Sequence, residues 1–467
     1  MTERPIDSKQ LPIEARRALG KSHRKLVPRS SHAAWKPDPK RSDPIKLLQA
    51  QDKGRIQELL PIKYGRMLAS PFAFYRGSAV VMAADLASTP VSSLEVILCG
   101  DAHLSNFGIF ATPERNLVFD INDFDEVYPG PWEWDIKRLA ASAVLAGREN
   151  GFKEKDCREL ALIACRAYHK AMARFSAASI LDVWYFHVNA DTLIQLFAKY
   201  AAKSANQAKK TINKAKTRTS ERTMQKLTEV VDGGRQFVNS PPLLQRLSDL
   251  LTEEQKAQIS QQDLEGLWFA YIKSLPQERR LLLERFRVTD AAMRVGGVGS
   301  VGTSCSILLL EGDTENDALI LQQKEAGPSA LAAYLPKRRF TNQAQRVVVG
   351  QRAMQAASDI FLGWQKSPLT GKAYYWRQLK DQKGSFDMQT LDMDGVAAYL
   401  AVCGGCLARA HARTGDSAWI SGYLGSGTVF DEAIGDFAVA YANQAEQDYL
   451  LLIDAVKTGR IEAQTGI

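Results

Sequence analysis

Long apolar runs are absent from this sequence of 467 residues. No segment reaches the roughly 18 consecutive apolar residues that a transmembrane helix needs. The first ten residues, MTERPIDSKQ, contain no apolar signal core. We therefore expect a soluble, cytoplasmic protein with no membrane partner.

Cysteine and histidine are scarce, with six residues of each. Six cysteines in so long a chain do not form the dense pattern of a secreted, disulfide-rich protein. Cys403 and Cys406 form one CxxC pair, and there is no second pair to complete a zinc site. The pair lies in YLAVCGGCLARAHAR, where apolar residues recur with helical spacing. We interpret it as core packing.

The net charge of +8 is concentrated at the N-terminus. Residues 1–66 hold 16 Lys and Arg against 7 Asp and Glu, whereas the remaining 401 residues hold 44 against 45. Such a basic arm is able to contact nucleic acid. Because no nucleic-acid-binding motif accompanies the charge, we favour a segment that wraps over the folded body, with Leu26, Trp35 and Leu47 as anchors.

The length predicts two lobes, because a single core stops growing at about 250–300 residues. Residues 290–385 are β-like, with the apolar runs CSILLLEG and DALILQQKEA between glycine clusters. Helical periodicity dominates residues 150–285 and returns from residue 394. The predicted regions are a basic arm (1–60), part of a mainly helical large lobe (61–289), a small β-rich lobe (290–385) and C-terminal helices that complete the large lobe (386–467).

A second basic stretch lies inside the helical region. Residues 199–223 carry eight Lys and Arg and one acid, Glu221. Such a run is usually a solvated helix or a mobile segment. A patch that attracts phosphate is the alternative interpretation.

Two acidic loops follow two predicted strands. The strand at 94–99 leads into CGDAHLSNFGIF (99–110), and the strand at 117–122 leads into the acidic part of FDINDFDEVYPGPWEWD (119–135). A short connection between the strands would bring Asp101, Asn106 and Asp123 together. Carboxylate and amide oxygens are the protein ligands that suit Mg²⁺, and a carboxylate left free of metal is able to accept the proton of an attacking hydroxyl. The pattern suits phosphoryl transfer.

A glycine-rich turn lies about two hundred residues further along the chain, in MRVGGVGSVGTSCSILLLEG (293–312). Strand, glycine-rich turn and strand is the order in which kinases cover a nucleotide's phosphates. The pattern alone is weak, because glycine-rich hairpins also occur for structural reasons. Lys324 closes the next apolar strand, as the phosphate-binding lysine of a kinase does. The predicted phosphate-binding residues are Gly296, Gly297, Gly299, Ser300, Gly302 and Lys324.

The acidic loops resemble those of the aminoglycoside phosphotransferase and choline kinase branch of the protein-kinase-like superfamily. The shared pattern is Gly-Asp-x-His-x-x-Asn, then a strand, then Asp-Phe-Asp and Gly-Pro before a helix-starting Asp. The words SPFAFYRGSA, GDAHLSNFG, NDFDEVYPGPWEWDIKRLAAS and QRAMQAASDIFLGW resemble a bacterial family called domain of unknown function 2252 (DUF2252). That resemblance extends from about Lys25 to about Leu451.

The resemblance assigns roles to individual residues. Asp101 looks like the catalytic aspartate, and Asn106 and Asp123 look like the Mg²⁺ ligands. Asp135 resembles the buried aspartate that braces the catalytic loop, and His103 a residue that packs within it. Asp120, Asp125 and Arg76 are expected to support the site. Cys99 departs from the phosphotransferase and choline kinase pattern, in which His usually precedes Gly-Asp.

The order of these motifs is reversed relative to a kinase, which implies a circularly permuted two-lobe kinase-like α+β fold. LARAHARTGD (407–416) supports this, because it resembles the helix that leads into the catalytic loop of phosphotransferases. A separate β domain at 290–385 is the alternative. The helix predicted at 341–358 has no acid in its body to pair with Lys324. The substitute partners are Gln345, Gln351, Gln355, Glu325 and Asp359.

The expected activity is an ATP- and Mg²⁺-dependent phosphotransferase whose acceptor is a hydroxyl of an unidentified small molecule or protein. A nucleotidyl (AMP) transferase on the same fold is the first alternative. A metal-dependent hydrolase built on Asp101, His103, Asp120 and Asp123 is the second, and a non-catalytic nucleotide-binding regulator is the third.

Overall fold

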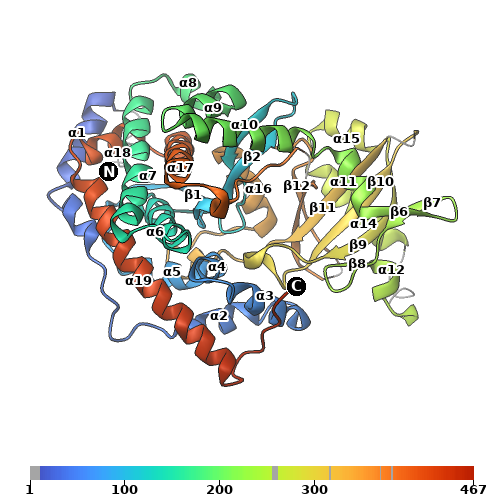
Figure 1. The fold of residues 1–467 in the computed structure, drawn as a ribbon. Helices are drawn as coiled ribbons and strands as arrows, with labels where there is room; N and C mark the ends of the chain where they lie inside the picture. The colour runs from blue at the N-terminus through green and yellow to red at the C-terminus, as the bar shows by residue number, and fades with distance from the viewer. Residues whose placement is uncertain (1–10, 255–260, 315–316, 369, 380–381) are drawn as a thin grey trace, which may run out of the picture.

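The computed structural model describes residues 11–467 except 255–260, 315–316, 369 and 380–381. A helical body occupies one side of the molecule and an antiparallel sheet with its own helices occupies the other (Figure 1). The predicted α+β class is confirmed.

The largest sheet has six antiparallel strands in the order β12-β13-β11-β10-β9-β8. Successive residues of β10 point to opposite faces of the sheet, and both faces are packed, because Ile307 and Leu309 belong to one apolar cluster and Leu308 and Leu310 to another. In register, Cys305 pairs with Lys324, and Lys324 pairs with Tyr375, so these three residues line up across neighbouring strands. The strands are β8 (Leu244–Arg246), β9 (Arg287–Arg294), β10 (Cys305–Glu311), β11 (Ala318–Glu325), β12 (Gly363–Lys366) and β13 (Ala373–Gln378).

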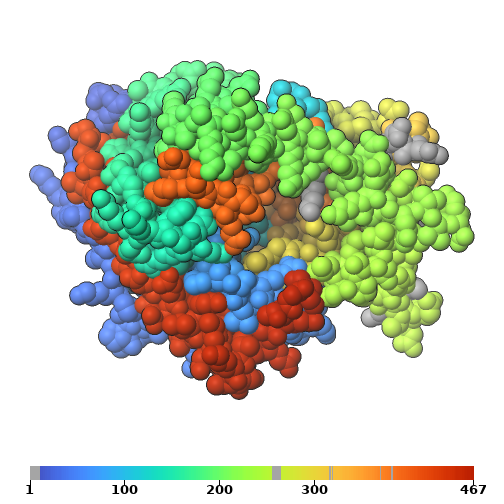
Figure 2. Space-filling view, in the orientation of Figure 1, coloured from blue at the N-terminus to red at the C-terminus, as the bar shows by residue number. Residues whose placement is uncertain are grey.

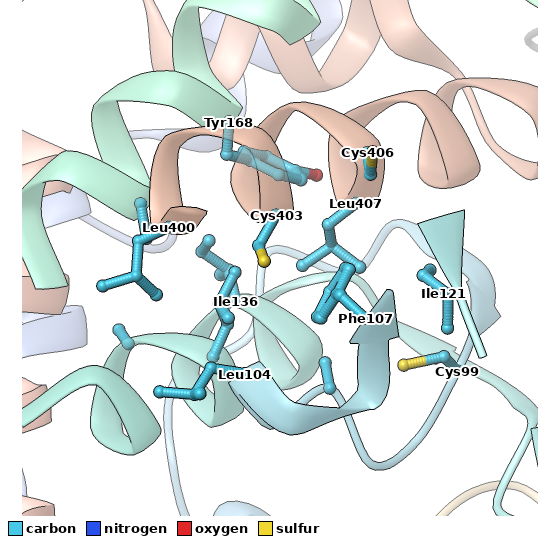
Figure 3. Packing of buried hydrophobic residues seen from close by; sticks show 14 of the residues in the cluster. Cys99, Leu104, Phe107, Ile121, Ile136, Tyr168, Leu400, Cys403, Cys406 and Leu407 are labelled. Atoms are coloured by element: carbon cyan, nitrogen blue, oxygen red, sulfur yellow. The ribbon is translucent and has the colours of Figure 1, made fainter. Parts of the chain in front are cut away.

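The body is built on long helices that pack around one core. Buried side chains from several of them, including Ile136, Tyr168, Leu400 and Cys403, belong to the same cluster as Phe107 (Figure 3). Both Cys403 and Cys406 are buried free thiols, as the packing interpretation predicts. The helices of this side are α1 (Ile13–His23), α2 (Pro44–Asp52), α3 (Leu60–Met67), α4 (Pro71–Gly77), α5 (Ala79–Leu86), α6 (Glu133–Glu149), α7 (Glu154–Phe175), α8 (Ile180–Tyr185), α9 (Ala190–Ala198), α17 (Met393–Thr414), α18 (Ser417–Leu424) and α19 (Val429–Lys457).

Two small antiparallel sheets position the acidic loops. One pairs β1 (Glu95–Leu98) with β4 (Tyr128–Pro131), and the other contains β2 (Phe107–Ala111), β3 (Leu117–Ile121) and β5 (Val188–Asn189). Strands β1 and β3 coincide with the two strands predicted from the sequence. Because β1 pairs with β4 and β2 with β3, the loops after β1 and β3 are held on the same side of the body.

The N-terminal segment lies on the body, as expected, although one predicted anchor does not. Leu26 is 76% exposed, whereas Trp35 packs edge-on against Tyr441 at a ring separation of 5.0 Å. His32 is buried, and its ring bonds to the Tyr423 hydroxyl at 2.7 Å. Aromatic and polar contacts with α18 and α19 therefore hold this segment in place. Residues 1–10 lie outside the described residues.

Residues 60–86 are helical, although their short apolar runs, interrupted by Gly and Asp, are a pattern typical of strands and loops. They form α3, α4 and α5, with Pro near the start of α3 and of α4. Proline favours the first helical turn, which a reading based on short apolar runs overlooks.

Residues 202–283 reach from the body to the sheet. They include α10 (Ala202–Lys216), α11 (Ser220–Leu227), α12 (Leu247–Leu250), α14 (Gln261–Lys273), α15 (Gln277–Leu283) and the hairpin of β6 (Thr228–Val231) and β7 (Gly234–Phe237). Tyr271 stacks on Trp376 at 4.5 Å, and β8 joins the sheet edge. The last part of the predicted helical region therefore packs with the β-rich side.

Helix α17 is the only helix of the described chain that is long and apolar enough to cross a membrane. Most of its length is buried among the other body helices, including α7. The core helix of a soluble-type fold has the same properties.

Candidate functional site

The loop after β1 is held by Gly100 and by the start of α6. Gly100 has φ +81°, and a Cβ there would lie 2.2 Å from the backbone oxygen of Glu126. Only glycine adopts this conformation without strain and permits so close an approach. The Asp135 carboxylate accepts hydrogen bonds from Cys99 N (2.8 Å) and Gly100 N (3.0 Å), and its Oδ2 lies 3.1 Å from His411 Nε2. Asp135 thus ties the loop to α6 and α17.

Asp101 lies in this loop, and one oxygen of its carboxylate is held by Arg138. Arg138 Nε donates to its Oδ1 at 2.7 Å, and the side chain stays 20% exposed. His103 Nε2 lies 3.7 Å from Asp101 Oδ2, too far for a strong hydrogen bond. Burial, opposed by Asp101 and assisted by Arg76 and Arg138, lowers the pKa of His103 to about 4. His103 is therefore neutral at neutral pH.

Asn106 joins the two acidic loops. Its side-chain amide donates to the backbone oxygens of Asp101 (3.0 Å) and Asp123 (3.1 Å). With the nitrogen committed to the protein, the Oδ1 atom is the group left for a ligand. An amide oxygen is a suitable ligand for a hard cation.

Asp123 is a carboxylate without a cationic partner at ion-pair distance within the described chain. Its Oδ1 accepts a long bond of 3.3 Å from Asp125 N. Burial and the neighbouring Asp125 raise its pKa, although Lys324 and Arg377 act in the opposite direction. A positive ligand beside Asp123 would relieve this cost.

Lys324 reaches from β11 into the second acidic loop. Its Nζ forms a short ion pair with Asp125 Oδ2, and the Tyr375 hydroxyl donates to Asp125 Oδ1 at 2.8 Å. Although burial acts in the opposite direction, Asp125 raises the pKa of Lys324, and Lys324 in turn lowers that of Asp125. Both groups are therefore charged at neutral pH.

Within the described chain, the side chains of four of the five sequence-based substitutes for the missing helix acid, all except Gln345, have other partners. α16 (Gln343–Met354) carries Gln345 and Gln351, and Gln351 donates to Gln355, which donates to Ile121 O. Glu325 pairs with Lys372, and Asp359 accepts from two backbone amides. Among the described contacts, the carboxylate that pairs with Lys324 is Asp125.

The glycine turn lies next to α3 and α4. Arg66 Nη1 donates to Gly296 O at 2.5 Å, and Arg55 Nη1 donates to Gly299 O at 2.9 Å. These arginines engage carbonyl groups of the turn and hold it in place. Gly302, at φ +86°, packs against Arg55 rather than facing the other predicted residues.

A single cleft of about 1540 Å³ brings these parts together. In Figure 2 the surface is hollowed near the centre of the view, between α4 (blue) and the α10–α11 segment (green). Predicted site residues that line the cleft are Arg76, Asp101, His103, Asn106, Asp123, Asp125, Gly296, Gly297, Gly299, Ser300 and Lys324. Three predicted residues, Asp120, Asp135 and Gly302, do not line it.

Asp120 is committed elsewhere. Its carboxylate is buried and receives Arg409 Nη2 at 2.6 and 2.7 Å, and also the backbone N–H of Ala356 at 2.9 Å. A carboxylate neutralised in this way is a structural group, not a free metal ligand.

Sequence reasoning missed Arg294 and Lys383, which line the cleft from the sheet side beside Arg377. Lys214, Arg218, Arg222 and Lys226 line the cleft from α10, the turn after it and α11. Burial and the nearby Arg377 lower the pKa of Lys383 to about 7. The basic run at 199–223 was a signal for the second group. Nothing in the local sequence, however, indicates that this run lines the same cleft as the acidic loops.

The residues present fit one Mg²⁺ ion better than a protein-only cluster. No group of three or more His, Cys, Asp and Glu side chains with metal-site geometry occurs among the described residues. Mg²⁺ commonly takes one or two protein carboxylates and completes its shell with water and substrate phosphates. Asp123 and the Asn106 oxygen meet that requirement.

Comparisons with known proteins identify the family. Searches of curated proteins and of solved structures gave no match. Residues 55–455 match the model of a family described as an uncharacterised protein conserved in bacteria (DUF2252). The match covers most of the chain and includes both acidic loops, the glycine turn and Lys324. The chain therefore belongs to the DUF2252 family.

Proposed function

We propose that this protein is a cytoplasmic, ATP- and Mg²⁺-dependent phosphotransferase that acts on a hydroxyl group. The observation that carries the proposal is the contact between Lys324 and Asp125. In this contact β11, the second strand after the glycine turn, meets the second acidic loop. A protein-kinase-like fold with permuted motif order accounts for this meeting of segments about two hundred residues apart.

Asp123 and Asn106 Oδ1 would hold Mg²⁺, which would neutralise phosphate charge. The chain supplies the remaining roles. N–H groups of the glycine turn and Lys324 would bind phosphate oxygens. Asp101, which Arg138 orients and which lines the cleft, would accept the proton of the acceptor hydroxyl.

The same residues are compatible with nucleotidyl transfer, which differs in the phosphorus atom attacked. The hydrolase alternative is less well supported. Asp120, which the hydrolase alternative needs as a metal ligand, is paired with Arg409. That alternative also requires residues 290–385 to be a separate module, but Lys324 of this sheet contacts the second acidic loop.

The test uses purified full-length protein with Mg²⁺ and ATP labelled separately at the γ- and α-phosphates. Transfer of the γ-label alone to protein or to small molecules of a cell extract supports phosphoryl transfer. Transfer of the α-label supports nucleotidyl transfer instead. Asp101→Asn should lower transfer by about 10²–10⁴-fold, the usual contribution of a general base, while nucleotide binding persists. Absence of Mg²⁺-dependent nucleotide binding would overturn the proposal.

A further inference from the structure

The cleft is larger and more positive than a nucleotide site requires. Small-molecule pockets usually measure about 300–1,000 Å³, whereas this cleft has a volume of about 1540 Å³. Ten Lys and Arg side chains and four carboxylates of the described residues line it. A nucleotide bound with its metal would offset only part of this excess, so room and positive charge remain for a second ligand.

Four of these cations form one wall. Lys214, Arg218, Arg222 and Lys226 recur at intervals of four residues along α10, the turn after it and α11. All four line the cleft and are exposed. We name them the basic quartet. Arg222 and Lys226 share one face of α11, since residues four apart on a helix are neighbours.

The basic quartet lacks the carboxylate partners that arginines elsewhere in this protein have. Arg148 pairs with Glu154, and Arg158 pairs with Asp436. Within the described chain no ion pair involves a quartet residue. Arg218 and Arg222 donate only to the backbone oxygens of Lys383 (3.1 Å) and Thr217 (3.4 Å). The quartet therefore presents to the cleft positive charge that no carboxylate of the described residues pairs with.

We propose that the acceptor is a small hydroxyl compound that already carries phosphate, and that the basic quartet binds this phosphate. The inference rests on the proposed function, because it names the acceptor of that site. A phosphate carries a charge of about −1.5 to −2 at neutral pH, which several cations match better than one. The planar guanidinium groups of Arg218 and Arg222 are each able to donate two parallel hydrogen bonds to the phosphate oxygens. The remaining volume suits a small molecule.

The test measures pyrophosphate binding calorimetrically, with the nucleotide site filled by Mg²⁺ and a non-hydrolysable ATP analogue. The quartet variant is K214Q/R218Q/R222Q/K226Q. The control K209Q/K210Q/K216Q removes three charges from the same helix at positions that do not line the cleft. We expect the quartet variant to lose at least tenfold in pyrophosphate affinity, the control to change less than twofold, and the analogue to bind all three proteins similarly.

Equal affinity of the quartet variant and the wild type, or an equal loss in the control, would overturn the inference. R222Q/K226Q serves as a second variant if the fourfold change prevents folding, and a loss of at least threefold is expected for it. If the wild type fails to bind the ATP analogue, the proposed function fails. Quartet-dependent pyrophosphate binding is still measured without the analogue, so the two failures are distinguishable.

Discussion

Lys324 on β11 and Asp125 in the loop after β3 form a partly buried ion pair across 199 positions of sequence. Under the proposed function, this pair would take the place of the lysine–glutamate contact that a kinase makes with its next helix. In this protein the second acidic loop supplies the carboxylate, and Tyr375 supports it from the neighbouring strand.

The first prediction concerns this pair. Lys324→Met leaves Asp125 without its cation, and Asp125→Asn leaves Lys324 without its anion, so each change should destabilise the fold. A double-mutant cycle by urea unfolding should give a coupling free energy of about 1–3 kcal/mol. A coupling of zero would mean that the contact does not contribute to stability. Lys324→Met should also weaken nucleotide binding.

The second prediction concerns Asp123 and Mg²⁺. Its raised pKa means that ionisation of Asp123 opposes folding as pH rises above the ordinary value for Asp. Asp123→Asn should therefore stabilise the metal-free protein at pH 7. Mg²⁺ with nucleotide should raise the melting temperature of the wild type and of the exposed-loop control Asp313→Asn, but not that of Asp123→Asn. An equal Mg²⁺ response in all three proteins would contradict the assignment.

The third prediction uses the glycine turn. A Cβ at Gly297 meets nothing within 4 Å, and one at Gly299 makes only ordinary contact with Arg76 O at 3.5 Å. Gly297→Ala and Gly299→Ala should therefore fold normally, with stability unchanged or raised by about 0.4–1 kcal/mol. A tenfold or greater loss of nucleotide affinity would report close approach of phosphate to this backbone. Gly427→Ala, outside the cleft, is the control, and unchanged affinity in both turn variants would count against a phosphate cradle.

The fourth prediction concerns His103, whose pKa is lowered to about 4. Below pH 6.5 the unfolded chain binds a proton that the folded protein excludes until about pH 4, so stability falls in this window. His103→Gln should remove roughly 2–3 kcal/mol of the loss in unfolding free energy between pH 7 and pH 4.5. The exposed His187→Gln should leave the loss unchanged. An identical pH profile for wild type and His103→Gln would show that this imidazole is not held neutral.

The fifth prediction separates Asp120 from the metal site. Asp120→Ala leaves the buried Arg409 uncompensated and should cost about 3–5 kcal/mol of unfolding free energy. The double variant Asp120→Ala/Arg409→Met should recover part of that loss. Mg²⁺-dependent nucleotide binding by folded Asp120→Ala should remain near the wild-type level. Loss of the Mg²⁺ response in that variant would mean that Asp120 is needed as a Mg²⁺ ligand.

Local patterns determined much of this protein. Apolar runs bounded by Gly and Asp indicated β1, β3, β10 and β11, because a buried strand needs such a run whatever surrounds it. The spacing of Asp101, Asn106 and Asp123 after two strands was enough to expect their proximity. The family was also evident from short words spread over most of the chain.

Tertiary structure decided which groups became partners. Asp120 and Asp123 lie three residues apart, yet one is neutralised by Arg409 and the other faces the cleft. Asp125 rather than α16 pairs with Lys324, and the basic quartet lines the same cleft as the acidic loops. Periodicity in the sequence indicates which face of a helix or strand is buried. It does not indicate which charged side chains pair, because the partners come from distant segments of the chain. Packing between segments hundreds of residues apart therefore settled these contacts.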